Sequence, residues 1–254
     1  MGSEQAALLP LLYESEDRYG WSVGMRAITH ALFKRIPLPD GPLLELGCGG
    51  GAFLHELKQR QNGRQLVGAD LHPAALVNAR RRLDISNSLV DANMLALPFP
   101  AAAFGAVVAL DSFDQQGVQL SLALAESHRV LRPGGLLLLR VSAYEWLHST
   151  HDRAFNTGRR YSSKEVQSVL VQHGFQPVAA TYANAMMLLP VAFVRLLQRY
   201  HFVPFTAAQY SASQFDELVK AILLMEAHWI AHWNIPFGIS LYVAAQKVVA
   251  AQKV

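Results

Sequence analysis

The chain has few cysteines, few charges and no long apolar run without an interruption. Cys48 is the only cysteine among 254 residues, so no disulfide forms within the chain and a reducing, cytoplasmic location is expected. Charged residues make up 16% of the sequence, which argues against long disordered tracts. We expect no secretory leader, because no apolar segment of that kind stands near the N-terminus. The apolar stretch Met186–Leu197 is interrupted by Pro190 and Arg195 and is too short to span a bilayer.

The charge balance is weak and spread along the chain. The formal net charge is +3, and the basic residues are scattered rather than gathered in one segment. A nucleic-acid groove needs a concentrated basic surface, so we expect a small-molecule substrate and no nucleic acid. Hydrophobic residues make up 52% of the sequence, enough for one large α/β domain with an appendage.

A cluster of glycines follows the first apolar run. Leu43–Leu46 predicts a β-strand, Gly47, Gly49 and Gly51 follow it, and a helical pattern starts at Ala52. Glycine leaves room for a ligand to approach the backbone, and the helix start adds exposed N–H groups with partial positive charge. The same spacing satisfies the dinucleotide fingerprint, whose third position accepts alanine, so a nicotinamide-dependent oxidoreductase is one alternative.

Acidic residues close the next two predicted strands. Asp70 ends a strand that begins at residue 65, and Asp91 ends a short strand that begins at residue 88. Asp70 lies roughly 20 residues beyond the glycines, where an acid that binds ribose hydroxyls is expected. Further strands are predicted over residues 104–110, 136–141, 176–182 and 238–245.

Five motifs occur in order along the first part of the chain: Glu45-Leu46-Gly47-Cys48-Gly49-x-Gly51, Asp70, Asp91, Leu97-Pro98-Phe99 and Leu131-Arg132-Pro133-Gly134-Gly135. Together they resemble class I S-adenosylmethionine-dependent methyltransferases, especially the bacterial small-molecule branch called type 11. The resemblance covers about residues 40–145. It implies a Rossmann-like, doubly wound α/β fold with a seven-stranded, mainly parallel sheet whose last strand is antiparallel. It also implies S-adenosylmethionine as cofactor and S-adenosylhomocysteine as product.

The chemistry of this cofactor matches the residues available. It has no pyrophosphate, so it needs close backbone contact at its amino-acid end rather than a basic cradle. A carboxylate is the stronger acceptor for paired ribose hydroxyls, and Asp70 suits that role. Asp91 suits the adenine amino group, with Leu71 and Ala92 as apolar neighbours of the ring. By resemblance, Glu45 supports the glycine loop or the methionine amino group. The expected cofactor-binding residues are Glu45, Gly47, Cys48, Gly49, Gly51, Asp70, Leu71, Asp91 and Ala92.

The N-terminal segment, residues 1–36, is expected to be a helical cap. Its pattern from Glu16 to Arg26 resembles an opening found in part of this methyltransferase branch, where the segment folds over the cofactor as a lid. Tyr13, Tyr19 and Trp21 are its candidate substrate-binding residues. The alternative is an amphipathic helix packed on the edge of the sheet.

A polar segment after the fifth predicted strand is a second candidate for substrate recognition. Ligands of doubly wound sheets bind beyond the carboxyl ends of the strands, where this segment lies. Its candidate substrate-binding residues are Arg159, Arg160 and Tyr161. The alternative is a solvated loop in which Ser162 caps the following helix, predicted over residues 164–173, with Glu165 completing a capping box.

The last two predicted strands are separated by about 50 residues, far more than a hairpin loop requires. We expect residues 183–235 to form a helical insertion, or lid, over the acceptor pocket, with its second helix over residues 213–233. The alternative is that its Met and aromatic residues are core between two helices. His228 and His232 have the spacing of zinc ligands but lack a third ligand, so no metal is expected. Residues 37–182 and 236–248 would form the core and 249–254 a tail.

The sequence therefore predicts methyl transfer to a small-molecule acceptor, with oxygen favoured over nitrogen and carbon. Such a displacement depends mainly on positioning, and a nearby base helps when the acceptor is a hydroxyl. His151 and Asp111 are the candidate catalytic bases. A non-catalytic module that binds the cofactor or a partner is the alternative from another class.

Overall fold

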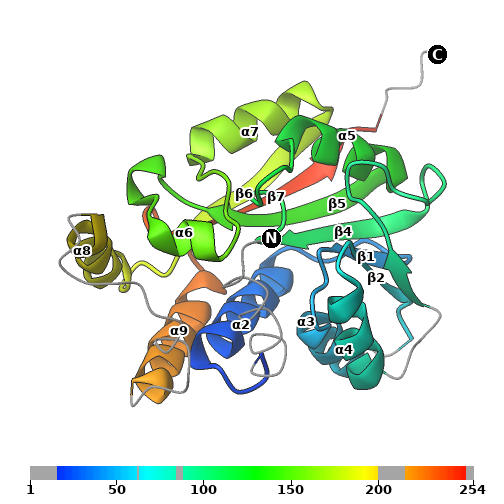
Figure 1. Cartoon of the computed structure of the whole chain (residues 1–254). Helices are drawn as coiled ribbons and strands as arrows, with labels where there is room; N and C mark the ends of the chain where they lie inside the picture. The colour runs from blue at the N-terminus through cyan, green and yellow to red at the C-terminus, as the bar shows by residue number, and fades with distance from the viewer. Residues whose placement is uncertain (1–15, 62, 84–87, 200–214, 250–254) are drawn as a thin grey trace.

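The computed structural model describes residues 16–61, 63–83, 88–199 and 215–249. Its centre is a seven-stranded sheet with the strand order β3-β2-β1-β4-β5-β7-β6 (Figure 1). β7 is antiparallel to both of its neighbours, and the pairs among β1 to β5 are parallel. The predicted fold class is therefore confirmed. The strands are β1 Leu43–Leu46, β2 Leu66–Asp70, β3 Leu89–Asp91, β4 Phe104–Leu110, β5 Leu131–Ser142, β6 Phe175–Ala183 and β7 Ser240–Lys247.

Helices cover both faces of the sheet. One face carries α2 Gly20–Arg35, α3 Ala52–Arg60, α4 Pro73–Leu83 and α9 Asp216–Ile230. The other carries α5 Leu120–Val130 and α7 Ser163–Gln172. The segment between β5 and α7 forms the short helices η2 Glu145–Leu147 and α6 Thr150–Ala154, and α8 Leu188–Arg199 follows β6.

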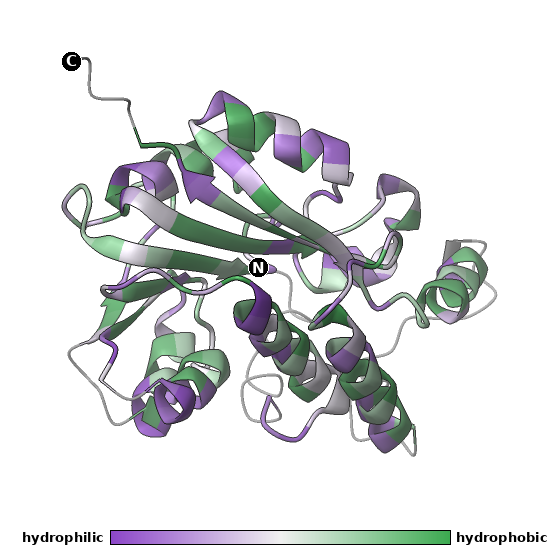
Figure 2. Cartoon of the chain, turned by 180° about the vertical axis from the view of Figure 1, so that it is seen from behind, coloured by the Kyte–Doolittle hydropathy of each residue, from purple (hydrophilic) through white to green (hydrophobic). Residues whose placement is uncertain are grey.

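The strands are apolar along their length because both faces of the sheet are covered. In β5, Leu136 and Leu138 pack in the cluster beneath α2 and α9, whereas Leu137 and Leu139 pack against α5 and α7. Figure 2 shows the hydrophobic strands of the sheet between layers of helices that contain both hydrophobic and hydrophilic residues.

Several boundaries differ from those predicted. β5 begins at Leu131, so it includes the glycines of the motif that precedes the predicted strand 136–141, and its pairing with β4 shifts register between Phe104 and Ala106. The helix predicted from residue 213 begins at Asp216, and residues 213 and 214 lie outside the described part of the chain. The predicted cap of α7 is present, because the Ser162 hydroxyl accepts from the Glu165 amide at 3.3 Å.

Two glycines let α2 and α9 approach each other closely. The Gly20 amide donates to the Asp216 carboxylate at 2.9 and 3.0 Å. A Cβ atom at Gly24 would lie 2.3 Å from the Cβ of Leu223, a distance that no side chain tolerates. The second helix of the insertion therefore packs beside the N-terminal helix under the sheet (Figures 1 and 2).

Candidate functional site

The glycine turn after β1 has the geometry that the sequence predicts. Gly47, Gly49 and Gly51 have φ values of 72°, 52° and 78°, in the left-handed region that favours glycine. A Cβ atom on Gly47 would lie 2.6 Å from the Cβ of Ser112, at the end of β4. The turn therefore brings bare backbone to the carboxyl ends of β1 and β4, and Gly51 leads directly into α3.

Two acidic residues stand beside the turn at neighbouring strand ends. Asp70 and Asp91 are register partners at the ends of β2 and β3. Asp70 is largely buried, and its carboxylate accepts from the Gly49 amide at 2.9 Å and the His72 amide at 2.8 Å. Asp91 is exposed. One carboxylate thus joins the second strand to the glycine turn, and the other stays open to solvent.

The apolar residues predicted to flank the adenine ring follow these acids. Leu71 is 58% exposed, and Ala92 is partly buried with its amide donating to the Asp70 carbonyl at 3.1 Å. An exposed leucine next to two carboxylates is a surface that an aromatic ring can cover.

Glu45 is buried within β1, directly before the glycines. Its Oε2 atom has no hydrogen-bond partner within the described residues. Burial raises the pKa of Glu45 well above its usual value, and the charges of Glu16 and Asp70 add to the effect. A buried carboxylate oxygen without a donor is costly, so it needs a cationic or hydrogen-bonding group. The ammonium group of S-adenosylmethionine has that chemistry, and the residues present therefore fit the cofactor.

Cys48 lies in the same turn, with its side chain buried. Burial raises the pKa of its thiol, so the side chain is a protonated, apolar group. Cys48 therefore contributes a packed apolar side chain and its backbone groups to the turn.

The segment before α2 reaches the glycine turn. Glu16 forms an ion pair with Arg82 at 2.9 Å, and Arg82 also donates to the Gly50 carbonyl. Burial raises the pKa of Glu16 in this position. Arg26 donates to the Glu16 carbonyl at 2.8 Å. These contacts hold Glu16, which precedes α2, against the turn expected to bind the cofactor.

The predicted substrate residues of the N-terminal segment are placed differently. Tyr13 lies outside the described residues. Tyr19 precedes α2, where burial and the charge of Asp216 raise its pKa to about 12. Trp21 packs against the core beneath the sheet. Of the two alternatives for the N-terminal segment, α2 therefore matches the helix packed on the sheet and not the lid over the cofactor.

Asp111, a predicted base, follows β4 with a φ of 54°, which is uncommon for a residue other than glycine. Both of its carboxylate oxygens accept from the Arg140 guanidinium, at 2.8 and 2.6 Å. Arg140 lies in β5 and also donates to the Tyr242 hydroxyl at 3.0 Å. The carboxylate is therefore engaged by a fixed cation, although its side chain is 45% exposed.

His151, the other predicted base, lies in α6. Burial lowers its pKa to about 3, and the charge of Arg195 adds to the effect. Its ring stacks on Phe155, with ring centroids 4.6 Å apart. At neutral pH the imidazole is therefore neutral and only weakly basic.

The polar segment after β5 is held by a buried ion triad. Asp152 pairs with Arg160 at 2.6 Å and with Arg195 of α8 at 3.1 Å. Burial alone would raise the pKa of Asp152, but the two guanidinium charges outweigh it and lower that pKa. Arg195 also donates to the Leu147 carbonyl at 2.5 Å. Arg160 is thus committed to a buried ion triad, in which Arg195 attaches α8 to α6.

The other two predicted residues of this segment differ in exposure, since Arg159 is exposed and Tyr161 is buried. Arg159 stacks over the Tyr161 ring, 5.2 Å from its centroid, and pairs with Glu165. Tyr161 is buried, and its backbone pairs with the end of β5. Substrate recognition by Arg159, Arg160 and Tyr161 remains a prediction.

Asp114 and the stacked pair Tyr144 and Tyr182 lie near the site but were not predicted as site residues from the sequence. The Asp114 carboxylate accepts from the Ser142 amide at 2.7 Å, while its Oδ1 atom has no partner within residues 16–61, 63–83, 88–199 and 215–249. Burial, followed by the charge of Asp111, raises the pKa of Asp114 to about 6. Tyr144 stacks on Tyr182, with ring centroids 5.2 Å apart. Asp114 could have been considered from the sequence, because it follows the strand predicted over residues 104–110 by four residues.

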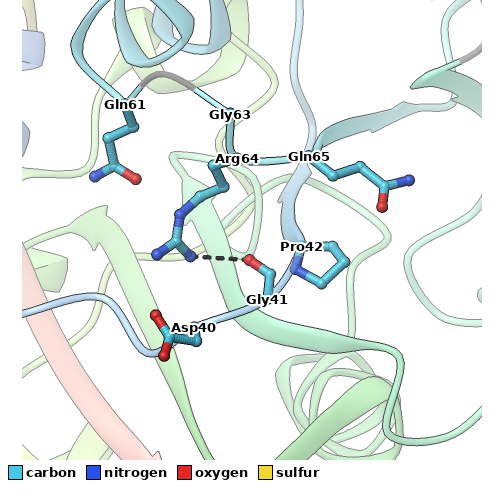
Figure 3. A pocket seen from close by; sticks show the side chains of 7 residues that line it. All are labelled: Asp40, Gly41, Pro42, Gln61, Gly63, Arg64 and Gln65. Carbon is cyan, nitrogen blue, oxygen red and sulfur yellow. Dashed lines mark hydrogen bonds between the residues drawn. The ribbon is translucent and has the colours of Figure 1, made fainter.

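A pocket at the opposite end of the sheet is separate from this site. Its lining comes from the segments that precede β1 and β2, where Arg64 donates to the Gly41 carbonyl at 3.1 Å (Figure 3). Ligands of this fold bind at the carboxyl ends of the strands, so the pocket at the amino ends is a gap between connecting segments.

The described part of the chain contains no group of three or more His, Cys, Asp and Glu residues placed to hold a metal ion. The His228 ring, on the last turn of α9, and the His232 ring, just beyond the helix, are 5.5 Å apart. No helix in the described ranges has both the length and the apolar character needed to cross a bilayer.

Known proteins share this fold and these motifs. Residues 44–139 match the model of the methyltransferase domain family. The demethylmenaquinone methyltransferase of Thermus thermophilus is 39% identical over 100 residues, which cover 38% of this chain and 45% of the relative. The malonyl-[acyl-carrier protein] O-methyltransferase of Alcanivorax borkumensis is 34% identical over 119 residues, which cover 45% of this chain and 40% of the relative. The fatty-acid O-methyltransferase of Mycolicibacterium smegmatis is 30% identical over 128 residues, which cover 50% of this chain and 45% of the relative. The chain thus spans less than half the length of these relatives.

Solved structures extend the likeness in fold over most of the chain. A Haloferax volcanii methyltransferase in complex with the Trm112 methyltransferase activator has a TM-score of 0.64 at 20% identity, covering 98% of this chain and 99% of that one. The geranyl diphosphate C-methyltransferase of Streptomyces coelicolor, in complex with S-adenosyl-L-homocysteine, has a TM-score of 0.57 at 20% identity, covering 87% and 79%.

The strand order, glycine turn and acidic strand ends define a class I methyltransferase fold. Residues 44–139 match the methyltransferase domain family, and these features make that part of the chain similar to S-adenosylmethionine-dependent methyltransferases.

Proposed function

We propose that this chain methylates an oxygen atom of a small-molecule acceptor, and that the oxygen belongs to a carboxylate. The glycine turn, Glu45, Asp70 and Asp91 would hold the cofactor at the carboxyl ends of β1 to β3. When bound, S-adenosylmethionine supplies a methyl group already activated on a sulfonium. The chain then has to position the acceptor and exclude water, which is the main source of catalysis for such a transfer.

The weakness of both predicted bases is the observation that carries the choice of a carboxylate. The Asp111 oxygens are both engaged by Arg140, and burial lowers the pKa of His151 to about 3. A hydroxyl acceptor must lose a proton during methylation and gains from a base. A carboxylate is ionised at neutral pH because its ordinary pKa is about 4. It therefore needs no base.

Relatives named as O-methyltransferases support oxygen as the methylated atom. Two of them act, by name, on a fatty acid and on a malonyl group carried by acyl-carrier protein. Fatty acids offer oxygen only as a carboxylate. The C-methyltransferase among the solved structures supports the fold alone.

The test measures the chemistry of the product. Purified protein would be given S-adenosylmethionine labelled in its methyl group and a panel of fatty acids, phenols and aliphatic alcohols. Methyl esters release labelled methanol in mild alkali, whereas methyl ethers and C-methyl products retain the label. We expect alkali-labile products and a kcat/KM that stays level above about pH 6, since the acceptor is already ionised there. Products that are all stable to alkali would contradict the proposal.

Asp114 supports a second candidate, methylation of a hydroxyl. Its unpartnered Oδ1 and its pKa of about 6 suit a base that is ionised at neutral pH. In that case kcat/KM rises with pH through about 6, and Asp114→Asn lowers kcat by about 10²–10⁴-fold. A domain that binds S-adenosylhomocysteine but methylates no acceptor in the panel would instead be the non-catalytic module.

A further inference from the structure

The helix α8 carries its polar side chains inward and its apolar side chains outward. Arg195 and Gln198 are buried, and Arg195 is held by Asp152 of α6. Leu189 is 79% exposed and Phe193 is 61% exposed. A helix on the surface of a globular protein normally has the opposite orientation. The ion pair therefore fixes α8 with its apolar side toward the surroundings.

The helix α9 has a second apolar stripe on the side away from α2. Leu223, Ala227 and Ile230 form its buried side. Trp229 lies off that side and is 59% exposed, and Trp233, three residues beyond the end of α9, is 64% exposed. Both views show α8 and α9 at the same end of the molecule, and α9 has hydrophobic colour along most of its length in Figure 2. Exposed apolar surface on two helices marks a binding face.

Cations gather at the end of α9 that carries the tryptophans. Arg35 donates to the carbonyls of Ile230 and Trp233 at 3.0 and 3.2 Å, which places its charge at this helix end. Lys34 is exposed on the same last turn of α2. His228 and His232 are exposed beside the tryptophans, with ring centroids 5.5 Å apart.

The exposed acidic residues of α9 lie at its other end, whereas Glu226, near the basic end, is buried and accepts from the Ala185 amide. Asp216 accepts from the Gly20 amide, and Glu217 is exposed beside Lys220. Fourteen residues separate Asp216 from Ile230, which corresponds to about 20 Å along the helix. The apolar stripe therefore runs from an acidic end to a basic end that carries tryptophans.

We propose that the outer faces of α8 and α9, called here the apolar face, bind the surface of a bilayer that contains anionic phospholipids. Tryptophan favours the boundary between headgroups and acyl chains, and nearby cations favour anionic headgroups. The tryptophans and the basic end of α9 favour a bilayer over a second copy of the chain, which would place like charges near one another across a two-fold axis. The proposal is independent of the methyl acceptor.

Flotation of the full chain with vesicles tests this inference. Vesicles of phosphatidylcholine alone are compared with vesicles that also contain phosphatidylglycerol. We expect retention on the anionic vesicles and a blue shift of tryptophan fluorescence. The double variants Leu189→Ser with Phe193→Ser and Trp229→Ser with Trp233→Ser should each weaken partitioning by at least about tenfold, because two large apolar side chains are lost.

A matched control removes exposed apolar residues from the opposite face of the sheet. Leu122 of α5 and Val171 of α7 are 46% and 61% exposed, and changing both to Ser should leave vesicle binding unchanged. Circular dichroism and S-adenosylhomocysteine titration establish that each variant is folded. The proposal fails if anionic vesicles retain no protein, if neutral vesicles retain as much, or if the control pair is affected equally. It also fails if ultracentrifugation shows a dimer that the apolar-face variants abolish and vesicles bind no protein.

Discussion

Replacing Glu45 by Gln should stabilise the cofactor-free protein and weaken cofactor binding. Glu45 is 3% exposed, and its Oε2 has no partner in the part of the chain that the structure describes. Burial, Glu16 and Asp70 all raise its pKa, so its ionised form is unfavourable at neutral pH. Gln keeps the shape of the side chain and removes the charge. The two effects have opposite signs, which separates a binding role from a structural one.

The size of the stability effect follows from the cost of an unpaired buried carboxylate. That cost is about 1–3 kcal/mol, and each kcal/mol shifts the Tm of a protein of this size by roughly 2–4 °C. The effect should depend on pH. With a raised folded-state pKa, the wild-type protein gains stability as the pH falls through that pKa toward the unfolded value near 4.5. The advantage of the Gln variant should therefore shrink as the pH falls.

The effect on binding follows from the loss of one charged hydrogen bond. Such a bond contributes about 1.5–3 kcal/mol, which corresponds to a Kd for S-adenosylmethionine that is roughly 10–100-fold higher. Urea denaturation at several pH values measures the first effect, and calorimetric titration measures the second. Glu217→Gln is the control, because that side chain is exposed at the start of α9. Unchanged affinity together with unchanged stability would show that Glu45 does not face the cofactor, and would refute the assignment.

Three further variants probe the site and its supports. Asp70→Ala should weaken S-adenosylhomocysteine binding by at least about 1 kcal/mol in calorimetric titration, through loss of a charged acceptor, and unchanged affinity would argue against its ribose role. Gly24→Ala should destabilise the protein by about 1–3 kcal/mol in urea, because the added Cβ meets Leu223, and a wild-type midpoint would contradict that contact. Arg195→Met should expose α8 to limited proteolysis by removing a partner of Asp152, with cofactor affinity retained; unchanged cleavage would mean that other contacts hold the helix.

The core fold could be predicted from the sequence because its signals are local. Apolar runs that end at Gly47, Asp70 and Asp91 define strand ends without information from distant residues. The sheet order then follows from the family to which these motifs belong. The cap formed by Ser162 was also predictable, since its partner lies three residues away.

The long-range pairs could not be predicted in the same way. Arg140 stands in an otherwise apolar strand, and this is a sign of a buried counter-ion, but nothing in the sequence identifies Asp111 as that ion. Similarly, Arg195 reads as an interruption of an apolar stretch, whereas in the structure it is the residue that fixes α8. Because periodicity shows that a helix has two sides but not which side is covered, the outward apolar side of α8 became visible only in three dimensions.

The pairing of α2 with α9 has a consequence for biosynthesis. Gly20 and Asp216 are 196 residues apart, so the first described helix to leave the ribosome waits for one of the last before it can dock. At about 5–20 residues per second, that delay is roughly 10–40 s. Throughout this interval the side of α2 that packs against α9 lacks its native cover, whereas the contacts of Arg26 and His30 with Glu56 of α3 can form early.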